Sequence, residues 1–186
     1  LRGADRAEAR MIVTDRLGLR PWTEADRPAF AAINGDPRVH DWLGGPITAE
    51  ASDALVDRIN AGIAAEGFGL WAAELRTDGR LAGMIGLSRV AEGNLPVGPC
   101  VEIGWRLHPD VWGQGLASEG ARAALDWGLG PGGIPEILAF TATTNLASQA
   151  VMRRIGMVAD PMRDFDHPRL AEGHPLRRHV VWTTRL

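Results

Sequence analysis

Two glycines at the start of an expected helix are the residues best suited to bind a ligand. Apolar side chains alternate along residues 101–107, as in a strand, and recur at helical spacing along residues 117–125. Gly113 and Gly115 lie between these two segments. Because neither glycine has a side chain, an anion can approach the unpaired amides of the first helical turn. The sequence therefore predicts a phosphate-binding site where this strand meets this helix.

Two other interpretations of the glycines stay open. Residues 113–118 nearly match the dinucleotide-binding pattern G-x-G-x-x-G, with Ser118 in place of the third glycine. Residues 108–112 separate the strand from the glycines, however, whereas a Rossmann turn follows its strand directly. No acidic residue clearly ends the next expected strand, where a ribose would be bound. The second alternative is a glycine turn that binds no ligand.

The sequence around the glycines resembles the GNAT N-acetyltransferase superfamily, and within it the RimJ/RimL-type branch. Residues 112–117, Trp-Gly-Gln-Gly-Leu-Ala, stand where this family has its Arg/Gln-x-x-Gly-x-Gly/Ala loop, although Trp112 departs from the pattern at the first position. The resemblance covers about residues 12–185. It also rests on residues 14–22, 36–37, 102–105, 117–119, 145–148 and 155–156. This combination is far more specific than the glycine loop alone.

The resemblance implies acetyl-CoA as a co-substrate and no metal. The pyrophosphate would bind the loop, whose residues are Trp112, Gly113, Gln114, Gly115, Leu116 and Ala117. The pantetheine arm would enter between two splayed parallel strands, residues 101–107 and 137–143. There it would pair with an exposed strand edge, through the backbone of Trp105, Arg106 and Leu107. Asn145 would contact CoA and also cap the following helix.

Acetyl transfer to an amine requires a base, a donor to the carbonyl oxygen and a proton for the leaving thiolate. Glu102 is the candidate base, and its alternative role is a structural pairing with Arg106 on the same strand face. The oxygen donor would be a backbone N–H near Arg106 or Leu107. Because the chain contains no Tyr, a tyrosine acid is excluded. Ser148 is the candidate acid in its place; its alternative role is to help Asn145 cap the helix, and one hydroxyl can do both.

The acceptor would lie between the first two helices and the C-terminal hairpin. Its candidate lining residues are Trp42, Phe68, Trp71, Asp166, His167 and His174. The Asp166-His167 pair raises a metal or base interpretation, but no third ligand follows at regular spacing, so a role in stabilising the loop is favoured.

The order of expected elements predicts the fold class. A strand over 12–20 precedes two helices, of which the second buries Ala51, Leu55, Ile59 and Ile63. A hairpin (70–75 and 81–90), the strand and helix described above, the strand 137–143 and a helix at 145–155 follow. Strands near 158–165 and 179–185 end the chain. The expected fold is α/β (α+β), the GNAT fold, with a mixed, mostly antiparallel sheet of about seven strands and helices on both faces. Residues 11–186 form one domain, and residues 1–10 are expected to be a disordered leader or cloning remnant.

Composition narrows the partners and the compartment. The chain has 186 residues and a formal net charge of -3, without a block of like charges, so a nucleic-acid partner is not expected. Its apolar runs are too short to cross a bilayer. Cys100 is the only cysteine, so no internal disulfide can form, which fits a cytoplasmic location. We expect a packed rather than nucleophilic Cys100, and a monomer or homodimer.

The leading functional hypothesis is an N-acetyltransferase that transfers an acetyl group to a primary amine by direct attack in a ternary complex. The acceptor is either a protein N-terminus or a small molecule, and the sequence does not choose between them. The alternative from another class is a non-catalytic acyl-CoA-binding module.

Overall fold

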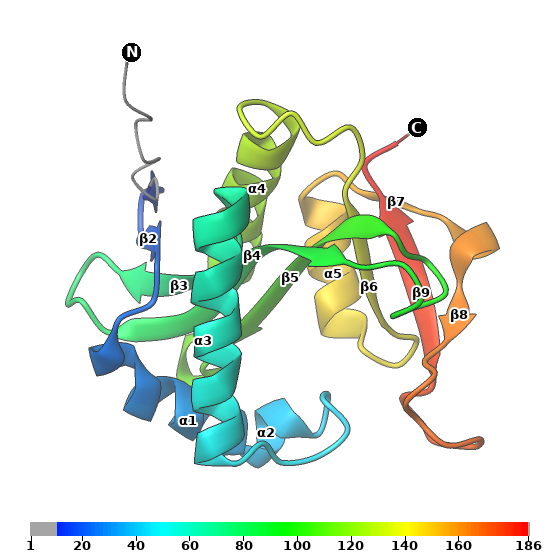
Figure 1. Cartoon of the computed structure of the whole chain (residues 1–186), viewed down its shortest axis with the longest axis horizontal. Coiled ribbons are helices and arrows are strands. Elements are labelled where there is room, and N and C mark those ends of the chain that lie inside the picture. The colour runs from blue at the N-terminus through cyan, green and yellow to red at the C-terminus, as the bar shows by residue number, and fades with distance from the viewer. Residues whose placement is uncertain (1–10, 186) are drawn as a thin grey trace.

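The computed structural model describes residues 11–185, and the expected leader at residues 1–10 lies outside them. Within this range a nine-stranded sheet forms with the order β1-β2-β3-β4-β5-β6-β9-β7, and β8 pairs with β9 (Figure 1). The strands are β1 Ile12–Val13, β2 Leu17–Arg20, β3 Leu70–Leu75, β4 Leu81–Val90, β5 Cys100–Leu107, β6 Leu138–Ala142, β7 Val158–Ala159, β8 Phe165–Asp166 and β9 Arg178–Thr183. The helices are α1 Arg27–Gly35, α2 Pro37–His40, α3 Ala49–Glu66, α4 Leu116–Leu129 and α5 Leu146–Arg154. Short 3-10 turns lie at Glu24–Asp26, Pro109–Val111 and Pro161–Arg163.

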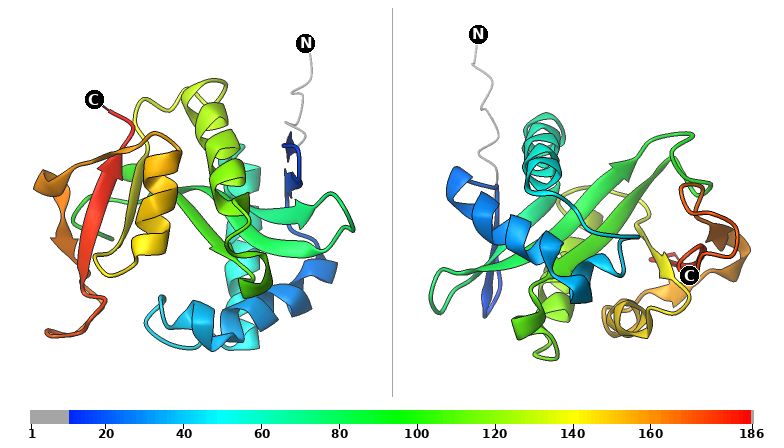
Figure 2. Two further views of the ribbon diagram at one scale, coloured as in Figure 1. Left: turned by 180° about the vertical axis from the view of Figure 1, so that it is seen from behind. Right: turned by 90° about the horizontal axis from the view of Figure 1, so that it is seen from below.

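Helices cover both faces of the sheet. Figure 2 shows α1 and α3 on one face and α4 and α5 on the other. The helix α4 packs closely against β4 at Gly120. A Cβ added there would lie 2.5 Å from the Ile85 side chain, too close for any larger residue. Any larger residue at Gly120 would push the start of α4 away from the sheet. No helix within residues 11–185 is long and apolar enough to cross a membrane.

The two central parallel strands diverge, as expected. They pair at a single position, Glu102 with Leu138, near the first residues of both strands. All other neighbouring strands are antiparallel. The C-terminal ends of β5 and β6 therefore separate, and α4 and α5 follow at this open end. The predicted fold class, with its splayed parallel pair, is confirmed.

Three local predictions were wrong. The strand expected over 12–20 is a hairpin of β1 and β2, in which the Thr14 N–H donates to the Leu17 carbonyl at 2.9 Å. The strand expected near 158–165 is interrupted at Pro161, which has no N–H for a ladder and instead starts a 3-10 turn. These two breaks explain why there are nine strands instead of about seven.

The third correction concerns the buried face of α3. The buried residues are Ser52, Val56, Ile59 and Ile63, whereas Ala51 is exposed and Leu55 only partly buried. The face alternates steps of four and three residues, which keeps it over the core, while a repeat of four alone drifts around the helix. Thr48 caps this helix as predicted, since its Oγ1 accepts the Ala51 N–H at 3.2 Å.

Candidate active site

The glycine loop presents a row of free backbone amides. Gly113 and Gly115 have φ values of +75° and +79°, a conformation that glycine adopts without strain. Within residues 11–185, none of the N–H groups from Gly113 to Ser118 has a protein acceptor. The Ser118 hydroxyl in the first turn of α4 is also buried without a partner there. Unpaired donors of this kind at a helix N-terminus fit a phosphate group.

Contacts from the N-terminal hairpin hold this loop in place. The Arg16 Nη1 donates to the Gln114 carbonyl at 2.8 Å, and its Nε donates to the Glu119 Oε2 at 2.6 Å. The Gln114 side chain donates to the Asp110 carbonyl at 3.0 Å. Sequence reasoning did not single out Arg16, because about a hundred residues separate it from its partners. The one sequence feature that could have pointed to Arg16 is that it lies within residues 14–22, one of the segments that resemble the family.

One edge of β5 has free backbone groups near the loop. The His108 N–H donates to the Ala82 carbonyl at 2.8 Å, so by strand alternation the peptide groups of Arg106 also point to β4. Those of Trp105 and Leu107 point to the diverging side, beyond the single bridge to β6. The Leu107 carbonyl there accepts the Trp112 indole N–H at 2.9 Å. Of the three residues predicted to contact the pantetheine arm by backbone, the geometry therefore favours Trp105 and Leu107.

Glu102 is a partly buried carboxyl group without a partner. It lies at the bridging end of β5, and within the described residues it forms no hydrogen bond or ion pair. Burial raises its pKa to about 8. The predicted alternative, a pairing with Arg106, is not formed. The Cα atoms of two residues four positions apart on a strand are about 13 Å from each other. Glu102 is therefore available to exchange a proton, and it is largely protonated at neutral pH.

Asn145 and Ser148 lie at the open end of the parallel pair, after β6. The Asn145 Oδ1 accepts the Ser148 N–H at 3.1 Å, so Asn145 caps α5 as predicted. Ser148 takes part in this cap through its amide, while its hydroxyl has no hydrogen-bond partner among residues 11–185. The hydroxyl thus remains available, and it lies at the same end of the sheet as the glycine loop.

Several residues predicted to line the acceptor site are elsewhere. Phe68 and Trp71 belong to the core, where both rings contact Trp127, with centroids 5.9 and 5.7 Å away. Trp42 is exposed, as an acceptor site allows. Asp166 forms ion pairs with Arg177 and Arg178. A metal interpretation of Asp166-His167 has no support, because no metal-binding group of His, Cys, Asp and Glu occurs among the described residues.

The remaining candidates lie in the C-terminal hairpin. The His167 ring is tilted against His179, with centroids 5.1 Å apart. Burial lowers the pKa of both imidazoles. His174 stabilises its own loop, since its Nδ1 accepts the Leu176 N–H at 3.1 Å. The loop role that the sequence favoured for His167 fits its contacts, since its Nδ1 accepts the Arg169 N–H at 3.3 Å.

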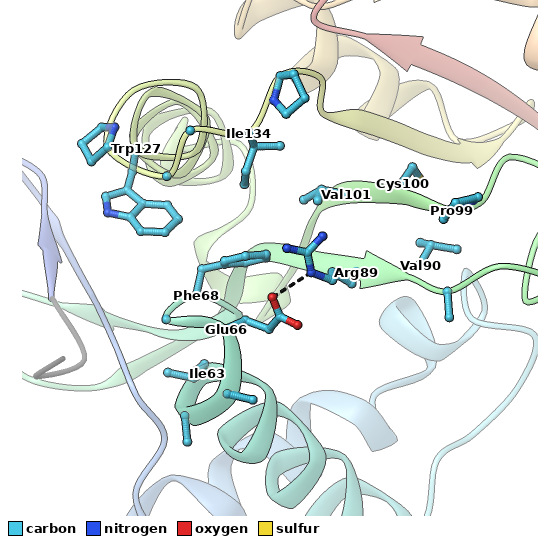
Figure 3. A pocket seen from close by; sticks show the side chains of 18 of the residues that line it. Ile63, Glu66, Phe68, Arg89, Val90, Pro99, Cys100, Val101, Trp127 and Ile134 are labelled. Carbon is cyan, nitrogen blue, oxygen red and sulfur yellow. Dashed lines mark hydrogen bonds and ion pairs between the residues drawn. The ribbon is translucent and has the colours of Figure 1, made fainter. Parts of the chain in front are cut away.

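A broad pocket at the other end of β5 is lined by Phe68, a predicted acceptor-site residue, but by none of the residues predicted to bind acetyl-CoA or to catalyse the transfer (Figure 3). Phe68, Arg89, Cys100 and Trp127 are among its lining residues, and Arg89 pairs with Glu66 at 2.8 Å. Burial raises the pKa of the Cys100 thiol to about 11, so almost no thiolate forms at neutral pH. This agrees with a packed cysteine and not with a nucleophile.

Comparison with known proteins decides the family. A model of the acetyltransferase (GNAT) domain matches residues 16–158. The chain belongs to the GNAT acetyltransferase family. It is 32% identical over 150 residues to FsC-acetyl coenzyme A-N(2)-transacetylase of Aspergillus fumigatus, an alignment of 77% of this chain and 63% of that protein. The chain thus spans less than two thirds of the fungal relative.

Solved structures agree with this assignment. An acetyltransferase from Agrobacterium tumefaciens is 27% identical with a TM-score of 0.77, and 95% of both chains is covered. RimL, the ribosomal L7/L12 alpha-N-protein acetyltransferase, solved in complex with coenzyme A, has a TM-score of 0.70 at 20% identity, with 94% and 97% covered. The latter likeness establishes a shared fold. The family assigned from the sequence is confirmed, and RimL is among the proteins that share this GNAT fold.

Proposed function

We propose that this protein is an N-acetyltransferase that moves the acetyl group of acetyl-CoA to a primary amine. The row of free amides from Gly113 to Ser118, beside the unpaired edge of β5, carries the proposal. These donors fit the pyrophosphate of CoA. The names of two related proteins support the choice of an amine: one is an N(2)-transacetylase and the other an alpha-N-protein acetyltransferase.

In this proposal the loop and the strand edge position acetyl-CoA. The amides of residues 113–118 bind the pyrophosphate, with Trp112 and Asn145 at the borders of the site. The pantetheine amides pair with the free peptide groups of Trp105, because the Leu107 carbonyl already accepts the Trp112 indole N–H. A free N–H on this edge, that of Leu107, is the candidate donor to the thioester oxygen as negative charge develops.

The transfer requires no covalent enzyme intermediate. The amine nitrogen attacks the thioester carbon, the new C–N bond forms and the C–S bond breaks. An ammonium acceptor loses two protons in total, one before attack and one from the attacking nitrogen. Glu102 in its ionised form takes the first proton. The second proton passes from the attacking nitrogen to solvent. The Ser148 hydroxyl protonates the CoA thiolate and recovers a proton from solvent, so one proton is released overall.

The deciding experiment measures both binding and turnover. The purified protein is titrated with CoA by calorimetry and then incubated with acetyl-CoA and a broad panel of amines and peptides. Free thiol and the acetylated product, detected by mass spectrometry, are both measured. We expect thiol release that matches acetylated amine. CoA binding without turnover on any amine would instead indicate the acyl-CoA-binding module.

A further inference from the structure

Arg106 is a cation without a counterion on the α1/α3 face of β5. Its Nη1 donates to the Asn34 Oδ1 at 2.6 Å, and its guanidinium lies over the Phe30 ring, 5.9 Å from the centroid. Its Nε is buried without any partner, and no carboxylate of residues 11–185 is within ion-pair distance. The Nη2 has no hydrogen-bond partner either, but it is not fully enclosed.

The groups around Arg106 orient it without neutralising it. Asn34 is fully buried and donates its Nδ2 to the Ser52 hydroxyl of α3 at 2.8 Å, so its oxygen is directed to Arg106. The two residues that contact the guanidinium, Asn34 and Phe30, are both neutral. A cation in partly buried surroundings normally has an anionic partner, because the lost hydration is otherwise uncompensated. An arginine held in this way is prepared for a carboxylate from outside the chain.

Arg106 shares its strand face with the candidate base. Positions 102, 104 and 106 face the same side of β5, and Gly104 places no side chain between the other two. A Cβ added at Gly104 would lie 3.9 Å from the Glu102 Oε1 and 3.7 Å from the Leu70 side chain. The Glu102 carboxyl thus lies beside position 104, toward Arg106, and a molecule that bridges the two groups would contact the Leu70 side chain.

We infer that the acceptor is a small amino acid, whose amine lies at Glu102 and whose carboxylate pairs with Arg106. This inference rests on the proposed function and narrows the acceptor to amines that carry their own carboxylate. It excludes protein N-termini without a nearby carboxylate as the preferred substrates. Arg106 would then determine specificity, while Glu102 takes part in the chemistry.

The test compares pairs of acceptors that differ only in the carboxylate. Glycine, β-alanine, 4-aminobutyrate and 5-aminopentanoate are each assayed against the matching carboxamide at saturating acetyl-CoA. For at least one chain length, the wild-type protein should prefer the carboxylate in kcat/KM. Arg106→Gln should lower that preference by about 10- to 100-fold, mainly through KM, because it removes a charge-assisted pair. The wild-type ratio of kcat/KM for carboxylate over carboxamide is divided by the same ratio for Arg106→Gln. This division cancels the difference in amine basicity within each pair.

Two further variants control for folding and for charge. Arg89→Gln removes a guanidinium that pairs with Glu66 and lies five residues along β4 from Met84, the register partner of Arg106, so it should keep the wild-type ratio. If Arg106→Gln fails to fold by circular dichroism, Arg106→Lys retains the charge and should lose only part of the preference, since it cannot form a bidentate pair. Equal rates on carboxylates and carboxamides, or faster rates on neutral peptide N-termini, would overturn the inference and leave the proposed function intact. Failure of every amine in the broad panel would instead reject the proposed function.

Discussion

At the scale of single residues, the unpaired carboxyl of Glu102 is the feature with the clearest chemical consequence. Its pKa of about 8 places its ionisation within the range in which an enzyme assay is practical. A base of this strength removes a proton from an ammonium more effectively than an ordinary carboxylate does. With this pKa, however, the Glu102 carboxyl is ionised in only a minority of molecules at pH 7.

Glu102→Gln tests this role through the pH dependence of kcat. In the wild type, kcat should rise with pH around an apparent pKa near 8, as Glu102 ionises. The glutamine variant cannot accept a proton, so its kcat should be about 10²- to 10⁴-fold lower at pH 9. Its remaining rate should follow the amine's own pKa. Unchanged acetyl-CoA affinity is the control, and a wild-type rate in the variant at neutral pH would make Glu102 a structural residue.

The same substitution should change stability in a predictable direction. Because the folded-state pKa of about 8 exceeds the ordinary value of 4.5, the folded protein binds more protons than the unfolded chain between these pH values. Its free energy of unfolding therefore falls as pH rises through this window. Glu102→Gln should remove that decline and be more stable than wild type at pH 8, by on the order of 4 kcal/mol.

Urea unfolding at pH 5 and pH 8 measures this difference. Glu136→Gln is the matched control, because Glu136 accepts from Arg163 and Thr183 and its pKa is lowered. That variant should lose stability at pH 8 instead of gaining it. A parallel pH dependence for Glu102→Gln and wild type would show that Glu102 is ordinarily ionised in the folded protein.

At the scale of elements, the start of α4 is where backbone amides, and not side chains, are proposed to bind the CoA pyrophosphate. Gly115→Val should strongly weaken CoA binding, because a branched side chain would crowd the free amides. The valine also strains the backbone, because φ at this position is +79°, so the variant needs a control for the loss of stability that strain causes. Gly79→Val in the β3–β4 turn, with φ of +74°, carries a similar strain far from the loop. Calorimetry should find wild-type CoA affinity for Gly79→Val, and equal affinities in the two variants would place the pyrophosphate elsewhere.

The elements differ in how far the sequence could predict them. The alternation in β5, the glycines before α4 and the Asn145 cap are local signals, and each predicted its element. The breaks in the outer strands depend on Pro161 and on a tight turn after Val13, which override an alternating pattern. The contact of Arg16 with the glycine loop and the isolation of Arg106 arise from packing between distant segments. No local pattern encodes such contacts, so the site could be located from sequence while its electrostatics could not.

At the scale of the whole molecule, the divergence of β5 and β6 separates two kinds of surface. The glycine loop and Ser148 follow the open end of the two strands, whereas Glu102 marks their bridging position. The side chains of Glu102 and Arg106 project to the α1/α3 face, opposite to α4. Acetyl-CoA and an acceptor can therefore approach from different sides of one strand and be bound together.

Simultaneous binding predicts the form of the initial-rate kinetics. Double-reciprocal plots against acetyl-CoA at several amine concentrations should intersect, because the amine attacks directly in a ternary complex. An acyl-enzyme would give parallel lines instead. The only cysteine is the obvious candidate for such an intermediate, but burial raises its pKa to about 11 and it lines the pocket at the bridging end of β5. Cys100→Ala should therefore retain most of the activity, and parallel lines together with loss of turnover in this variant would identify Cys100 as a nucleophile.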